Sequence, residues 1–144
     1  MDKLSKQRRS RNMARIRSAN TAPELAVRRE LRSMRVGYRI HDKRLPGRPD
    51  IVMWGRKKAI FVHGCFWHQH EGCIDGRRPQ TRREYWDTKL DRNVARDEQH
   101  LRQLAEMGWD VLVVWDCQTR DEPKLKRTLA QYLDLEGKRA ISRP

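Results

Sequence analysis

The sequence lacks any apolar run of about 18 residues, the length that a membrane-spanning helix requires. Its amino terminus is rich in arginine and has no apolar stretch of the kind found in secretory signals. Cysteine is scarce, and the three cysteines present are an odd number, which argues against a disulfide framework. We therefore expect a protein that acts in the cytoplasm, without membrane insertion or export.

Acidic residues are too few to balance the basic ones. The 33 Lys and Arg exceed the 19 Asp and Glu, which gives a net charge of +14 over 144 residues. Such an excess indicates a polyanionic partner, either nucleic acid or an anionic membrane. The length suits one domain, and we expect a basic arm (1–20), a folded domain (21–136) and a basic tail (137–144). The arm is expected to contact phosphates; a solubilising tail is the alternative.

Hydrophobic periodicity and turn signals predict an α/β fold, in which helices flank a small mixed sheet. A capping box of Thr21 and Glu24 opens the first helix, which ends before Gly37. Its expected apolar face consists of Leu25, Val27, Leu31 and Met34. Strands are predicted at 38–41, 50–54 and 59–63.

The second half of the chain predicts a helix, a strand and another helix. We expect a basic, largely irregular segment at 75–92, followed by a helix at 93–107. The run 109–115 is nearly all apolar, which predicts a central strand buried on both faces. Asp121 is expected to cap the last helix.

The strands at 50–54 and 59–63 are close enough in sequence to form a hairpin. If its turn centres on Arg56 and Lys57, Asp50 lies opposite His63. The carboxylate of Asp50 then faces a segment, 62–73, that contains three histidines and two cysteines.

This segment, together with the third cysteine, offers the four ligands that a closed tetrahedral zinc site needs. The candidate ligands are Cys65, His70, Cys73 and Cys117. They can meet only if the strands at 59–63 and 109–115 lie side by side. Three unrelated thiols are the alternative. The zinc set leaves His63 and His68 available for chemistry.

Asp50 follows Pro49 at the start of a strand, which is the weak outline of a PD-(D/E)xK nuclease pattern. The second acidic residue and the lysine of that pattern are missing from 59–63. A histidine could replace them, because His68 could deprotonate water while Asp50 holds a hydrated magnesium ion. Capping of a turn is the alternative role for Asp50.

Several motifs together resemble the very short patch repair (Vsr) endonuclease family. They are GRPD (47–50), FVHGCFWH (61–68), TR with EYW (81–86), NV with RD (93–97) and GW with VL (108–112). The resemblance covers about residues 10 to 135. It implies a restriction-endonuclease-like sheet and an enzyme that nicks DNA 5′ of the thymine in a T:G mismatch, which deamination of 5-methylcytosine creates.

The resemblance also implies roles for individual residues. Asp50 matches the magnesium ligand, and Val62 matches a backbone carbonyl ligand at a position where the family often has threonine. His68 matches the general base, and Asp97 matches the carboxylate that orients it. Without the resemblance, Asp97 would be read as an ordinary solvated helix residue. The residues that match holders of metal-bound water are His63 and Glu24.

The zinc ligands inferred above also match the family's structural zinc set. Here two residues, Glu71 and Gly72, stand between His70 and Cys73, where one residue is usual in the family. The side chains that match those inserted into the duplex beside the mismatch are Phe66, Trp67 and Trp86, with Met13 entering from the opposite groove. Core packing is the alternative for the first three. The remaining tryptophans are expected in the core: Trp54, Trp109 and Trp115.

These observations predict a magnesium-dependent T:G nickase with a structural zinc ion. Its expected partner is double-stranded DNA with a T:G mismatch, followed by downstream repair proteins, and it is expected to act as a monomer. Two alternatives stay open at this point. One is a noncatalytic zinc-stapled DNA-binding module, and the other is a related nickase of different or broader specificity.

Overall fold

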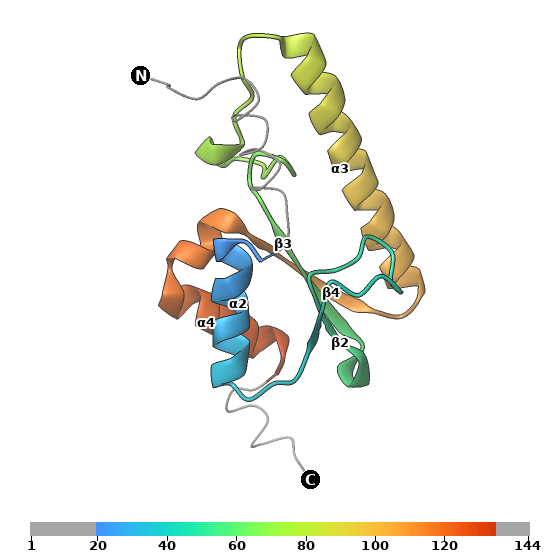
Figure 1. Ribbon diagram of the computed structural model, residues 1–144, viewed down its shortest axis with the longest axis vertical. Helices are drawn as coiled ribbons and strands as arrows, with labels where there is room; N and C mark the ends of the chain where they lie inside the picture. The colour runs from blue at the N-terminus through green and yellow to red at the C-terminus, as the bar shows by residue number, and fades with distance from the viewer. Residues whose placement is uncertain (1–19, 135–144) are drawn as a thin grey trace.

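The computed structural model describes residues 20–134, which form a four-stranded mixed sheet flanked by helices (Figure 1). The strands, in their order across the sheet, are β1 (Arg39–Ile40), β2 (Ile51–Met53), β3 (Lys58–His63) and β4 (Asp110–Trp115). The helices are α2 (Ala22–Ser33), α3 (Arg83–Glu106) and α4 (Glu122–Tyr132). The predicted α/β architecture is confirmed. Nearly all of the expected arm, with Met13, and the expected tail lie outside the described residues.

Helices α2 and α4 pack together on one face of the sheet (Figure 1). The buried residues that they share with the strands are Val27, Leu31, Ile51, Met53, Ile60, Val114, Leu125, Leu129 and Leu133. The last helix begins as predicted, since the Asp121 side chain accepts a hydrogen bond from the Lys124 N–H. Side chains alternate along a strand, so the neighbours of these residues point to the opposite face.

That opposite face is covered by the C-terminal half of α3 (Figure 1). The second buried cluster consists of Leu45, Val52, Ala59, Phe61, Leu104 and Trp109. His63 continues the series of Ala59 and Phe61 along β3, and it lies where the apolar cluster ends. Strand β3 therefore begins within an apolar layer and ends at a polar site.

The predicted apolar face of the first helix is wrong at Leu25, which is 44% exposed. Two helical positions correspond to a rotation of about 200°, so Leu25 lies across the helix from the fully buried Val27. The buried stripe instead contains Glu24 and Glu30 beside Val27 and Leu31.

The predicted hairpin register is also wrong. Ile51 pairs with Ile60, and Val52 pairs with Ala59, so every pair is displaced by two residues from the expected one. The connection is a 3-10 turn, Trp54–Arg56, followed by Lys57 in the left-handed region, rather than a tight turn centred on Arg56 and Lys57. A shift of two preserves the face on which each side chain lies.

Helix α3 begins ten residues earlier than predicted, within the segment expected to be irregular. Its N-cap, Arg82, has a left-handed backbone and makes no capping hydrogen bond through its side chain, so the sequence carries no start signal there. In the first half of the helix only Leu90 is buried. Tertiary contacts, described below, hold this half.

The prediction for the last strand is wrong in its position. β4 lies at the end of the strand order and pairs in parallel with β3 alone among the described strands. Of its residues only Val114 is buried, because the helices cover this edge of the sheet incompletely. The predicted adjacency of this strand to β3 is confirmed.

Two of the three tryptophans predicted for the core are not buried. Trp109 is buried, whereas Trp115 is intermediate and Trp54, in the turn after β2, is exposed. The Trp54 Nε1–H donates to Asp42 at 2.8 Å, and the Arg44 guanidinium covers its ring. Within residues 20–134, no helix is both long and apolar enough to cross a bilayer.

Candidate active site and metal centre

An open cavity of about 970 Å³ lies where the carboxyl end of β3 meets the first turn of α2 and the middle of α3. The predicted site residues that line it are Glu24, Asp50, Val62, His63, Trp67, His68 and Asp97. Residues from four separate segments, at 24, 50, 62–68 and 97, therefore meet at one place. The hairpin does not pair Asp50 with His63, yet both side chains reach this cavity.

Three groups on one side of the cavity could hold a cation. Glu24, His41 and Asp50 each offer a ligand atom, and these atoms lie within 4.8 Å of one another. The Asp50 carboxylate accepts a hydrogen bond of 2.7 Å from the Val62 N–H, which fixes it beside the end of β3. Burial raises the pKa of Asp50 to about 6, and the nearby Glu24 carboxylate adds to this effect.

Glu24 reaches this group from the first turn of α2. Its N–H donates to the Thr21 hydroxyl at 3.4 Å, as a helix cap does. Its carboxylate, which the predicted capping box would use, instead accepts from Arg28 at 3.0 Å and contacts His41 Nε2 at 2.7 Å. A carboxylate with only 4% of its residue exposed is thus directed toward the cavity.

His68 and Asp97 form a pair on the other side of the cavity. The distance from His68 Nδ1 to Asp97 Oδ2 is 2.6 Å. When Nδ1 donates to the carboxylate, Nε2 carries the lone pair and can accept a proton. Asp97 is a half-buried residue of α3 and not the solvated surface residue that its sequence alone would suggest.

His63 stacks on His68, with their ring centroids 3.8 Å apart. The pKa of His63 is lowered to about 3, mainly by burial and in addition by the adjacent His68. Its Nδ1 is buried and has no hydrogen-bond partner among the described residues. A neutral imidazole with a buried, unsatisfied nitrogen suits a role in binding water or a cation at the cavity wall.

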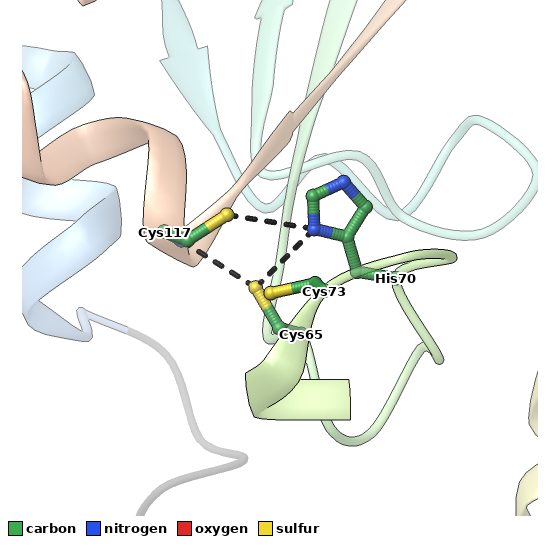
Figure 2. A group of neighbouring side chains, drawn as sticks. All are labelled: Cys65, His70, Cys73 and Cys117. Atoms are coloured by element: carbon green, nitrogen blue, oxygen red, sulfur yellow. Dashed lines mark hydrogen bonds between the residues drawn. The ribbon is translucent and has the colours of Figure 1, made fainter. Parts of the chain in front are cut away.

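The four predicted zinc ligands come together beside the cavity (Figure 2). Their ligand atoms lie within 4.8 Å of one another, and His70 Nδ1 is 3.7 Å from Cys65 Sγ and 3.4 Å from Cys117 Sγ. A tetrahedral zinc ion would set such sulfur–nitrogen distances at about 3.6 Å. The donor set therefore fits a closed tetrahedral zinc site.

The loop that carries three of these ligands is tightly folded. The two residues between His70 and Cys73 form a turn in which Gly72 has a φ of +76° and the Cys73 N–H donates to the His70 carbonyl. At Gly76, a Cβ atom would lie 2.9 Å from the His70 carbonyl oxygen. The extra residue is thus absorbed by a glycine turn, and the four ligand atoms still converge.

The three aromatic residues predicted to enter DNA form one cluster at the rim of the cavity. The ring centroid of Phe66 is 5.0 Å from that of Trp67 and 5.4 Å from that of Trp86, and the two tryptophans are 5.9 Å apart. All three are partly exposed rather than buried in the core. We call Phe66, Trp67 and Trp86 the aromatic cluster.

The sequence reading missed His41. The signal was present, because β1 pairs antiparallel with β2 and the His41 N–H donates to the Asp50 carbonyl at 3.2 Å. A register for β1 and β2 would have placed His41 directly opposite Asp50. It also missed three cavity-lining residues of α3, which are Arg96, next to Asp97, and Asn93 and His100, each about one turn away.

Comparison with known proteins gives a consistent result. A family model described as DNA mismatch endonuclease Vsr matches residues 1–74. The type II nicking enzyme V.XorIIP of Xanthomonas oryzae pv. oryzae is 47% identical over 92% of this chain and 97% of its own length. The DNA mismatch endonuclease Vsr of Escherichia coli is 42% identical over 86% of this chain and 79% of its own length. The type II nicking enzyme V.NmeAIP of Neisseria meningitidis is 37% identical over 84% and 86%, respectively.

Proposed function

The chain belongs to the Vsr family of DNA mismatch endonucleases, and we propose from this premise that it is a magnesium-dependent nickase specific for T:G mismatches. As a member of the family it is a DNA-nicking endonuclease. Our proposal adds that it is specific for the T:G mispair, that it cuts 5′ of the thymine and that magnesium is its catalytic ion. It thereby assigns the protein to the repair of deaminated 5-methylcytosine.

One observation carries the proposal. The Glu24, His41 and Asp50 group and the His68–Asp97 pair line the same cavity, and the aromatic cluster lies at its rim. Oxygen ligands suited to magnesium, a proton acceptor and a duplex-inserting surface are therefore within reach of one nucleotide.

Asp50 would hold magnesium together with the Val62 carbonyl, and Glu24 and His63 would orient water around it. Bound magnesium polarises the phosphate and stabilises the charge that develops on its oxygens. The chain's part is to keep the Asp50 carboxylate in place through the Val62 N–H and to orient the Glu24 carboxylate through Arg28. The valine side chain at position 62 does not affect a contact made through the backbone.

His68 is the proposed general base. The Asp97 carboxylate accepts a hydrogen bond from the Nδ1–H, so Nε2 faces the attacking water as an acceptor, and the ring becomes positively charged when Nε2 takes the proton. The Asp97 carboxylate then stabilises this imidazolium. His63 is a poor candidate for the same role, because its pKa of about 3 leaves it unable to retain a proton near neutrality.

The aromatic cluster accounts for the proposed preference for a mispair. Inserting side chains between base pairs requires unstacking, which costs a few kcal/mol and costs least where pairing is already weak. The opposing strand would be spared because one cavity carries one set of catalytic residues, which fits action as a monomer. Met13 would assist from the opposite groove, and repair proteins would process the nick.

The function is tested with an end-labelled T:G duplex, magnesium and two variants, Asp50→Asn and His68→Ala. We expect each variant to retain the affinity of the wild-type protein for the duplex and to nick about 10²- to 10⁴-fold more slowly. Glu98→Gln is the matched control, since Glu98 is an exposed carboxylate on α3 next to Asp97.

The alternatives predict different results. A noncatalytic DNA-binding module would bind the mismatched duplex and leave it intact in the wild-type form. A nickase of broader specificity would cut matched and mismatched duplexes at similar rates, with the same loss in both variants. Either result would refute the proposed specificity. Only a wild-type protein that leaves the mismatched duplex intact would refute catalysis.

A further inference from the structure

The aromatic cluster is assembled from two segments that are far apart in the sequence. Phe66 and Trp67 lie in the loop after β3, whereas Trp86 lies in the first turn of α3. The first half of α3 extends beyond the sheet (Figure 1), and in it only Leu90 is buried. The apolar core therefore does little to fix Trp86 relative to the other two rings.

On the loop side, Gln69 fixes the backbone of the cluster. Its Nε2 donates to the Phe66 carbonyl at 2.7 Å and to the Gly76 carbonyl at 2.9 Å. Gln69 has a φ of +54°, an unusual conformation for a residue other than glycine. A separate hydrogen bond of 3.1 Å joins Asn93 of α3 to the Trp67 carbonyl.

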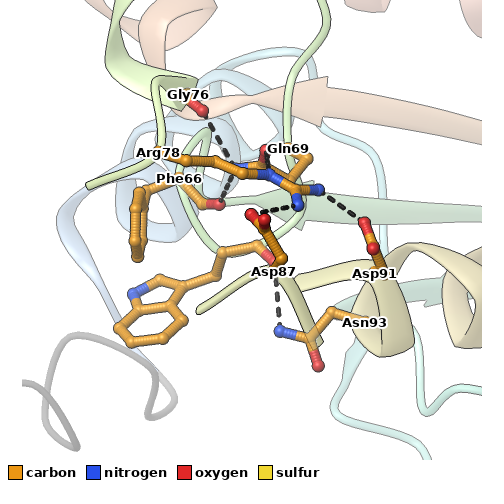
Figure 3. A network of polar contacts seen from close by, with 8 residues as sticks. Phe66, Gln69, Gly76, Arg78, Asp87, Asp91 and Asn93 are labelled. Atoms are coloured by element: carbon orange, nitrogen blue, oxygen red, sulfur yellow. Dashed lines mark hydrogen bonds and ion pairs between the residues drawn. The ribbon is translucent and has the colours of Figure 1, made fainter. Parts of the chain in front are cut away.

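Arg78 joins the two sides (Figure 3). Its Nε donates to Gln69 Oε1 at 2.7 Å, its Nη1 donates to Asp87 at 2.9 Å, and its Nη2 donates to Asp91 at 2.7 Å. Asp87 and Asp91 are four positions apart, so they lie on one face of α3. Asp87 directly follows Trp86.

We propose that Arg78 is a positioning residue that holds Trp86 at the correct distance from Phe66 and Trp67 for insertion at a mispair. The inference rests on the proposed function, since it concerns how that site recognises DNA. All three nitrogens of the planar guanidinium donate hydrogen bonds. A rigid fork of donors fixes both the distance between the segments it joins and their orientation.

The charge of Arg78 supports this role over a phosphate contact. In a chain of net charge +14, most exposed arginines are available to DNA. Arg78 instead faces two carboxylates at ion-pair distance, and its side chain is 30% exposed. The local charge of the trio is negative, so the trio as a whole does not attract a polyanion.

The experiment measures the affinity of the full-length protein for a T:G duplex and for the matched duplex, and takes their ratio. Arg78→Met breaks the link from the arginine side and leaves two unpaired carboxylates. The double variant Asp87→Asn with Asp91→Asn breaks it from the α3 side and removes two negative charges. Arg77→Met is the matched control, because Arg77 is exposed and no side-chain contact is found for it within residues 20–134.

We expect the ratio to fall about tenfold in both network variants, because charge-assisted hydrogen bonds are lost in each. Affinity for the matched duplex should change in opposite directions, weaker for Arg78→Met and stronger for the aspartate variant. The affinity ratio of Arg78→Lys should lie between those of the wild type and Arg78→Met, since lysine can pair with one carboxylate but cannot form the fork. Arg77→Met should preserve the ratio.

A second measurement follows the insertion itself. The fluorescence of 2-aminopurine next to the mispair rises when the base is unstacked, and we expect a smaller rise for Arg78→Met even at saturating protein. Bound zinc and the melting temperature of the free protein serve as folding controls.

A ratio within about twofold of wild type in either network variant, or an undiminished fluorescence rise, would overturn the role of Arg78. Failure of the proposed function would look different. In that case the wild-type protein itself would show no preference for the T:G duplex.

Discussion

The rings of His63 and His68 stack on each other, but their surroundings differ and favour different roles. His68 has Asp97 at one ring nitrogen, while His63 is buried and has no partner at Nδ1 among the described residues. Because the pKa of His63 is about 3, it stays neutral near pH 7. A neutral neighbour does not repel the positive charge that His68 gains on accepting a proton.

Asp97→Asn tests the orienting role of this carboxylate. An amide can donate to Nδ1, which would leave the proton on Nε2 and remove the acceptor that the reaction needs. We expect single-turnover nicking of the T:G duplex to fall about 10²- to 10⁴-fold, with little change in duplex affinity. Equal rates for Asp97→Asn and the control Glu98→Gln would contradict the assignment.

His41→Ala tests the residue opposite Asp50. His41 contacts Glu24 at 2.7 Å, and loss of a partner that orients a metal-site carboxylate typically weakens metal affinity by about 10- to 100-fold. We expect the half-saturating magnesium concentration to rise within this range, with partial recovery in His41→Gln. Direct calorimetry of magnesium binding provides a readout independent of nicking. An unchanged affinity in both variants would place His41 outside the metal site.

Among the elements, α4 is tied to the sheet by the hydroxyl of Tyr132 in addition to its apolar contacts. Tyr132 accepts from the Ala59 N–H at 3.1 Å and lies within hydrogen-bonding distance of the carbonyls of Ala59 and Asp110, to one of which it donates. The helix thus contacts the backbone of β3 and β4 where the two strands begin to pair. Burial raises the pKa of the Tyr132 phenol, as expected for a hydroxyl that stays protonated.

Tyr132→Phe should therefore lower the free energy of unfolding by about 1–3 kcal/mol, because the backbone groups lose their partner. Tyr38→Phe is the matched control, since Tyr38 is partly buried against the same core and no side-chain hydrogen bond is found for it in the described part of the chain. Chemical denaturation measures both. A loss of the same size in the two variants would argue against the hydroxyl's role.

The loop after β3 carries three of the four candidate zinc ligands. Removal of zinc by a chelator should lower the melting temperature by about 10 °C or more, because a structural zinc ion contributes several kcal/mol to folding. Nicking should be lost even in excess magnesium and should return with added zinc. Elemental analysis of fresh protein should find about one zinc per chain. Absence of zinc together with an unchanged melting temperature would refute the site.

The elements differ in how much their sequences reveal. Thr21 and Asp121 are local caps, so the starts of α2 and α4 could be predicted. The start of α3 could not, because Arg82 is no cap and the half that follows is held by Arg78 and the aromatic cluster. Likewise, the apolar sequence of β4 indicates a strand but not its place at the end of the sheet, which depends on how far the helices extend.

The candidate site shows the same division. The Cys3His group was predictable because the chain has only three cysteines and His70 lies between two of them in the sequence, and the separation of His70 from Cys73 mattered little once Gly72 formed a turn. The pair of Asp97 and His68 came only from the family resemblance. His41 was not predicted, because its place opposite Asp50 depends on the register between β1 and β2 and not on a local motif.

For the molecule as a whole, the parallel pairing of β3 and β4 organises the function. The carboxyl ends of parallel strands meet at one edge of a sheet, and here that edge carries His63 and His68, the candidate zinc ligands and two rings of the aromatic cluster. A zinc ion bound by these ligands would join the loop after β3 to Cys117, just beyond β4. The residues proposed for recognition and those proposed for cutting therefore lie at the same edge of the sheet.

The most direct test of this account is a nicking assay on end-labelled duplexes that are identical except for one base pair. With magnesium, we predict a single cut 5′ of the thymine in the T:G duplex, about 100-fold faster than cutting of the matched duplex or of other mispairs, since a few kcal/mol of unstacking cost separates them. The strand that carries guanine should remain intact. Equal cutting of all duplexes, or cutting of both strands, would contradict the account.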